Sequence, residues 1–118
     1  MQSIKSLSLG DAQRVIQAGI AKAKEIRSPS NIEVADAGGN LLAFARMEDA
    51  WLGSIDIAIN KAFTSRAFNV ATKQLADLAQ PGEQFYGIHA SNHGRVMIFA
   101  GGLPLKSSDK VIGAVGVP

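Results

Sequence analysis

Five consecutive residues, Asp36-Ala37-Gly38-Gly39-Asn40, constrain the fold more than any other segment of the chain. Asp, Gly and Asn favour tight turns, because Gly adopts left-handed dihedrals and Asp side chains bond to nearby backbone N–H groups. An alternating run containing Ile32 and Val34 precedes the turn, and the apolar run 41–47 follows it. Two short apolar runs joined in this way are typical of a β-hairpin. We therefore expect a hairpin in which Asp36 bonds to the backbone of Gly38 or Gly39.

Helical spacing occurs on both sides of this hairpin. Before it, Ser8 can cap a helix with one apolar face, which should stop ahead of Ser28-Pro29. After it come a helix opened by Ser54 and a shorter helix capped by Thr72. Three further strands are predicted, at residues 84–88, 95–100 and 111–117. The order predicts an α+β fold, with a five-stranded antiparallel sheet packed against helices.

Composition narrows the function classes. A length of 118 residues predicts one domain, spanning residues 1–118. The chain has no cysteine, which excludes disulfides, thiolate metal sites and thiol catalysis. The net charge is only +2 and the basic residues are spread along the sequence, so we expect no nucleic-acid partner. No signal peptide or membrane-length apolar run is visible, so we expect no membrane partner and a cytoplasmic location.

Several segments, in order along almost the whole chain, resemble one family. The hairpin segment 34–41 and its continuation 46–50 look like that family's first hairpin, and Ser54 with residues 61–64 is similar to its next helix. Segments 94–105 and 111–117 resemble its closing strands. The family is the GlcG/HbpS-like, or haem-degrading-like, family, which includes PduO C-terminal-like domains.

The resemblance implies a profilin-like fold and a small-molecule ligand, for which haem is the candidate cofactor. It also implies a homo-oligomer, a dimer or a larger assembly. The chain departs from the family in three ways: its first helix has no His, it has no Asp-x-x-Glu spacing, and it ends at Pro118 without the family's Gly-rich extension and final helix. We therefore expect a domain that lacks this C-terminal helix.

His89 and His93 are the only histidines, and they are candidates for haem or metal ligation. A zinc site needs three or four ligands, so two histidines are a weak metal signal. Haem needs only one or two axial ligands, which makes it the more economical partner. The alternative is that both are polar loop residues. If either binds a ligand, we expect it to be His89, because it adjoins Ile88.

Arg46 and Lys61 are candidates for holding haem propionates or the carboxylate of a small acid. A guanidinium grips a carboxylate through two parallel hydrogen bonds, and an ammonium acts as a point charge. The alternative for each is a salt bridge to a neighbouring acid. Gly38 and Gly39 can let a flat ligand approach the backbone closely.

Three functions stay open at this point. The first is a module that binds haem or a related tetrapyrrole. The second is an enzyme or accessory protein acting on a small hydroxy- or oxo-carboxylic acid, with His89 or His93 as acid and base. The third is a structural homo-oligomer. No nucleophile motif or acid–base pair is visible, so the expectation leans away from an enzyme.

Overall fold

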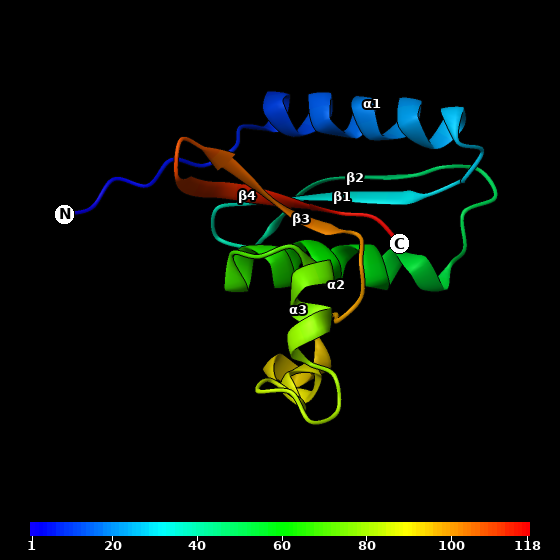
Figure 1. The fold of residues 1–118 in the computed structure, drawn as a ribbon. Helices are drawn as coiled ribbons and strands as arrows, with labels where there is room; N and C mark the ends of the chain where they lie inside the picture. The colour runs from blue at the N-terminus through cyan, green and yellow to red at the C-terminus, as the bar shows by residue number, and fades with distance from the viewer.

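The computed structural model describes residues 1–118 as a sheet with helices on both faces (Figure 1). The helices are α1 (Leu9–Glu25), α2 (Gly53–Phe68) and α3 (Thr72–Leu78). The strands are β1 (Asn31–Asp36), β2 (Leu41–Arg46), β3 (Gly102–Ser107) and β4 (Lys110–Gly116). Two short 3₁₀ turns, η1 (Ile88–Ala90) and η2 (Asn92–Gly94), lie between α3 and β3. The sheet order is β2-β1-β4-β3 and every neighbouring pair is antiparallel, so β1 and β4 are central.

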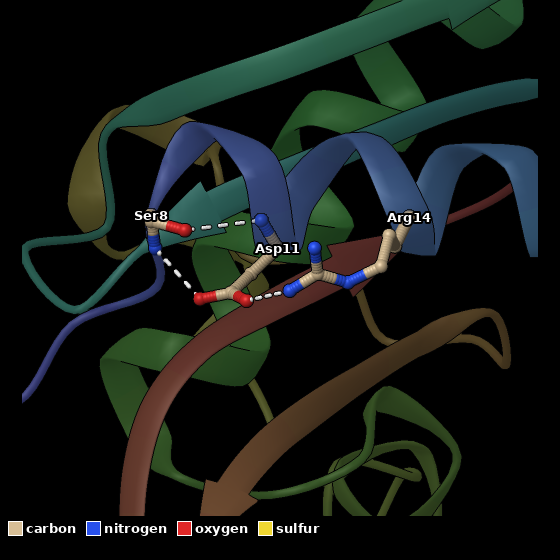
Figure 2. A network of polar contacts seen from close by, with 3 residues as sticks. All are labelled: Ser8, Asp11 and Arg14. Carbon is tan, nitrogen blue, oxygen red and sulfur yellow. Dashed lines mark hydrogen bonds and ion pairs between the residues drawn. The ribbon is translucent and has the colours of Figure 1, made fainter.

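Helix α1 begins where the sequence predicts, at a capping box (Figure 2). The Ser8 hydroxyl accepts a hydrogen bond from the Asp11 backbone N–H at 3.0 Å, and the Asp11 carboxylate accepts one from the Ser8 N–H at 3.1 Å. The hydrogen bond from the Ser8 N–H is the main cause that holds the pKa of Asp11 below its usual range. Arg14, one turn later, pairs with the same carboxylate. Two N–H groups that helix formation leaves free are therefore satisfied locally.

The predicted hairpin is confirmed as β1 and β2. Oδ1 of Asp36 accepts hydrogen bonds from the backbone N–H groups of Gly38, at 2.9 Å, and Asn40, at 3.1 Å. Gly39 has a φ of +79°, which a residue with a side chain rarely adopts. The hydrogen bond between Asp36 and the backbone of Gly38, expected from the sequence, thus helps to close the hairpin.

The two faces of the central strands pack against different helices. Ile32 and Val34 form a core with Ala12 and Ile16 of α1. Ala35, on the other face, packs with Ala62 of α2 and Ala114 of β4.

Glycine sets the spacing between α2 and β4. A Cβ placed on Gly116 would lie 2.0 Å from the carbonyl oxygen of Ala58, so no side chain fits there. Helix α2 therefore sits closer to β4 than any other residue at position 116 would allow.

The prediction of five strands is wrong, since the sheet has four. Residues 95–100 form no strand, because a side chain of α2 takes the place of a strand partner. The Thr64 hydroxyl accepts a hydrogen bond from the backbone N–H of Met97 at 3.0 Å and lies 3.3 Å from the carbonyl oxygen of Arg95. Val96 between them is only 1% exposed, so the strand-like composition reflects burial against the helix. Residues 84–88, also predicted as a strand, form turns that lead into η1.

Strand β3 occupies Gly102–Ser107, which begins after the predicted strand at residues 95–100. Pro104 is tolerated there because β3 is an edge strand, on which one backbone face needs no partner. The Gly102 N–H donates to Oγ1 of Thr72 at 2.8 Å, so Thr72 anchors this strand. The predicted cap roles of Thr72 and Ser54 are wrong: the N-cap positions are Ala71 and Leu52, and Ser54 is buried.

None of the helices is long and apolar enough to cross a membrane.

Candidate functional site

Both histidines lie in the 3₁₀ turns, which project with α3 on the side of α2 away from the sheet (Figure 1). His89 and His93 are exposed, and no hydrogen bond within the protein engages either imidazole. The ring of Tyr86 meets that of His89 edge-on, with centroids 6.1 Å apart. His93 has a φ of +58°, an unusual value for a residue with a side chain. The segment presents two free imidazoles to solvent.

Lys61, in contrast, is fully buried in the middle of α2. Its Nζ donates to the carbonyl oxygen of Ala100 at 2.7 Å and lies 4.0 Å from the centroid of the Phe99 ring. Burial lowers the pKa of Lys61 to about 8, because the charged ammonium loses its hydration. In one chain, Lys61 therefore holds the backbone ahead of β3 and is not open to a ligand.

Arg46 and the two turn glycines lie at opposite ends of the hairpin. Arg46 ends β2, an edge strand, where it is exposed and paired in register with Asn31. It forms no ion pair, so the predicted salt-bridge alternative is not found for it. Gly38 and Gly39 line a small hollow of about 230 Å³ with Phe63 and Arg66 of α2.

These candidate residues do not surround one hollow of the single chain. None of the five principal surface hollows is lined by His89, His93, Arg46 or Lys61. No group of three or more His, Asp and Glu side chains is placed to hold a metal ion. A ligand role for each residue stays a prediction, and a joint role within one subunit has no geometric support.

The sequence reading missed Glu33, a buried acid on central strand β1. Glu33 is 1% exposed, and its Oε2 has no hydrogen-bond partner. Burial raises the pKa of Glu33 to about 8, against the opposing effect of the nearby Arg95 guanidinium. The sequence shows Glu33 alternating with Ile32 and Val34, a pattern that suggests a solvent-facing position. The position is buried because α2 covers this face of the sheet as α1 covers the other.

A chain of polar contacts connects α2 to Arg95, which follows the segment that carries the histidines. Nε of Arg95 donates to Oδ1 of Asn60 at 3.2 Å, and Nδ2 of Asn60 donates to Asp56 at 3.1 Å. The Arg95 guanidinium also stacks on Phe63, with 3.8 Å between its central carbon and the ring centroid. These contacts fix the end of the η1–η2 segment on α2.

A second feature missed from sequence is a basic hollow of about 590 Å³. The N-terminal arm, the end of α2 and the β3–β4 hairpin form it. Its cations are Lys5, Arg66, Lys106 and Lys110, and its single acid is Asp109. Lys5, Arg66 and the β3–β4 hairpin are far apart in sequence, so no local pattern could have shown the cluster. We call this site the basic hollow.

A less polar groove of about 430 Å³ adjoins the basic hollow, since Asn69 and Lys106 line both. It runs between β3 and the segment that joins α2 to α3. Its apolar lining residues are Val70, Ala71, Ala100, Leu103, Pro104 and Val117.

The fold thus defines an α+β domain with a four-stranded antiparallel sheet between helices. Residues 7–118 match the family described as "Haem degrading protein HbpS-like", and the chain belongs to this family. The resemblance stated from the sequence is confirmed.

Three relatives illustrate the range of the family. The chain is 45% identical over 98% of its length to an uncharacterized 15.0 kDa protein from the dhaT–dhaS intergenic region of Citrobacter freundii, and covers 82% of that protein. It is 34% identical over 95% of its length to the corrinoid adenosyltransferase PduO of Salmonella typhimurium, of which it covers 33%. Among solved structures, it resembles the PduOC:Heme complex with a TM-score of 0.91 and 34% identity, over 95% of this chain and 81% of the other.

Proposed function

We propose that this protein binds a small molecule, and that the ligand is haem or a related tetrapyrrole. The observation that carries the proposal is the similarity to PduOC, which was crystallised as a haem complex and is 34% identical to this chain over the aligned residues, at a TM-score of 0.91. The match to the HbpS-like family over residues 7–118 supports it.

The η1–η2 segment offers the groups that such a ligand needs. Haem iron requires an axial donor, and His89 presents an exposed imidazole with no protein hydrogen bond. Phe85 and Tyr86, adjacent in the same segment, are 40% and 61% exposed, and exposed aromatic side chains can stack on a flat ligand. Of the two cations predicted to hold a propionate, Lys61 is buried and Arg46 is exposed, so Arg46 is the remaining candidate. His89 would hold the haem iron at an open surface, and it shares no hollow with Arg46 in the single chain.

An open surface would leave most of the macrocycle in water. We therefore propose that a second copy of the chain covers it, which joins the haem proposal to that of a homo-oligomer. Both sheet edges, β2 and β3, lack a strand partner in the single chain. Trp51 and Leu52 are 81% and 72% exposed, and burying them would favour association.

A haemin titration tests the proposal. Purified protein is expected to give a saturable Soret band at one haem per chain or per dimer. His89→Ala should weaken binding by at least tenfold and shift the band, and the His89→Ala/His93→Ala double variant should abolish the specific band. Lys24→Ala, on the exposed face of α1, is the matched control and should behave as the parent. An unchanged band and affinity in the double variant would show that no imidazole ligates the iron.

A further inference from the structure

The positive charge of this protein is concentrated in one place. The basic hollow contains four cationic side chains and one acidic one, an excess of three positive charges. The whole chain has a net charge of only +2, so everything outside the hollow sums to about one negative charge. A concave site lined by one sign of charge focuses its field and attracts ions of the opposite sign.

The cations of the basic hollow are not neutralised by the protein. The ion pairs of the structure are Arg14–Asp11 and Lys22–Glu25, and both lie on α1. Lys5, Lys106 and Lys110 are exposed and have no carboxylate within ion-pair distance. Their mutual repulsion is relieved when an anion binds between them.

One of the cations is held in place before any ligand arrives. Nε of Arg66 donates to the carbonyl oxygen of Ala37, and Nη1 donates to Oδ1 of Asn69 at 2.9 Å. These two bonds fix the guanidinium plane and leave Nη2 without a protein partner. Asn69 uses its oxygen for Arg66, so its amide nitrogen remains free to donate into the hollow, which it also lines.

We infer that the basic hollow is a binding site for a small molecule that carries two or more phosphate or carboxylate groups. Arg66 grips one anionic group from a fixed position, and Lys5, Lys106 and Lys110 hold the others as mobile point charges. An excess of three positive charges favours a polyanion over a singly charged acid. A volume of about 590 Å³ suits a small metabolite better than a polymer. The site contains no residue of the η1–η2 segment, so this inference stands apart from the haem proposal.

Isothermal titration of the full chain with pyrophosphate and with citrate tests the inference, at an ionic strength kept constant with sodium chloride. We expect saturable 1:1 binding of at least one of the two probes, and the probe that binds identifies phosphate or carboxylate as the preferred group. Acetate, a singly charged acid, should bind at least tenfold more weakly.

Charge-reversal variants locate the site. Lys106→Glu/Lys110→Glu should weaken binding of the probe by at least tenfold, because both residues are exposed and neither anchors the fold. Lys22→Glu/Lys24→Glu on α1 changes the net charge equally and should bind as the parent does. Equal weakening by both pairs would show a general charge effect and overturn the inference. So would the absence of saturable binding by either probe.

Discussion

Glu33 is a buried acid whose ionisation is expected to destabilise the folded state. It is 1% exposed on a central strand, and its Oε2 has no hydrogen-bond partner. The pKa of Glu33 is raised from 4.5 to about 8 because burial penalises the carboxylate. A group whose pKa is higher in the folded state stabilises the protein below its unfolded pKa, and this stabilisation is lost as pH rises to the folded value. Glu33 therefore lowers the free energy of unfolding progressively between about pH 4.5 and pH 8.

Glu33→Gln is expected to remove this loss, because the amide has nearly the same shape and carries no charge at any pH. At pH 8 the variant should exceed the parent in free energy of unfolding by on the order of 2–4 kcal/mol, and at pH 4 the two should be nearly equal. Urea denaturation between pH 4 and pH 8 measures the difference. A constant difference across that range would show that Glu33 does not titrate with the raised pKa.

For Lys61 we expect the opposite pH dependence: at higher pH, the free energy of unfolding should rise with pH. Its pKa falls from 10.5 in the unfolded chain to about 8 in the folded one, so its stabilisation is present above pH 10.5 and lost as pH falls to 8. Stability should therefore increase between about pH 8 and pH 10.5 in the parent relative to Lys61→Met, which cannot titrate. Paired urea denaturation at pH 8 and pH 10 tests this. Equal changes in the two proteins would contradict the lowered pKa.

At the scale of elements, one of the contacts that hold the segment between α3 and β3 on α2 is made by Thr64. The Thr64 hydroxyl lies 2.7 Å from the carbonyl oxygen of Asn60 and accepts from the Met97 N–H at 3.0 Å. Together with the contacts of Arg95 to Asn60 and Phe63, this side chain holds residues 95–97 on the helix. The composition of residues 95–100 predicts a strand because apolar and β-branched residues suit any buried extended chain, with or without a strand partner.

Thr64→Val keeps the shape of the side chain and removes the hydroxyl, which leaves the Met97 N–H without its acceptor. We expect a loss of about 1–3 kcal/mol in unfolding free energy. Amide hydrogen exchange at Met97 should become faster, and Thr64→Ser should restore slow exchange because it supplies the hydroxyl again. Slow exchange at Met97 in Thr64→Val would mean that another group satisfies this N–H.

At the scale of the whole molecule, the sheet is open at both edges. Strand β3 is one of these edges: Leu103 on it is 55% exposed, and Phe99 just before it is 47% exposed. Unpaired edge strands with apolar side chains readily join other chains. The proposed homo-oligomer would bury this edge.

Light scattering at micromolar concentration is expected to give a dimer or a larger assembly for the parent. Leu103→Lys should shift the mass toward the monomer, because a charge at the interface must be desolvated. Leu41→Lys makes the same change on the opposite edge, where Leu41 is 54% exposed, and should leave the mass unchanged. A monomeric parent, or equal effects of the two substitutions, would contradict an interface at β3.

The features that could be predicted from the sequence are those that depend on neighbouring residues. The capping box at Ser8, the periodicity of α1 and the hairpin closed by Asp36 each lie within a few residues of chain. The family resemblance also depends on short motifs of neighbouring residues, in the right order along the chain, and it is confirmed.

Long-range packing decided the rest. Whether Glu33 faces water depends on its strand being central and covered by α2, and alternation in sequence reports only that it faces away from Ile32. The strand at residues 95–100 is absent because Thr64, some thirty positions earlier, takes its backbone bonds. The basic hollow exists because the sheet topology brings residues 5, 66, 106 and 110 to one end of the molecule. Distance along a chain does not measure distance in space, so charges that look dispersed in sequence can share one site.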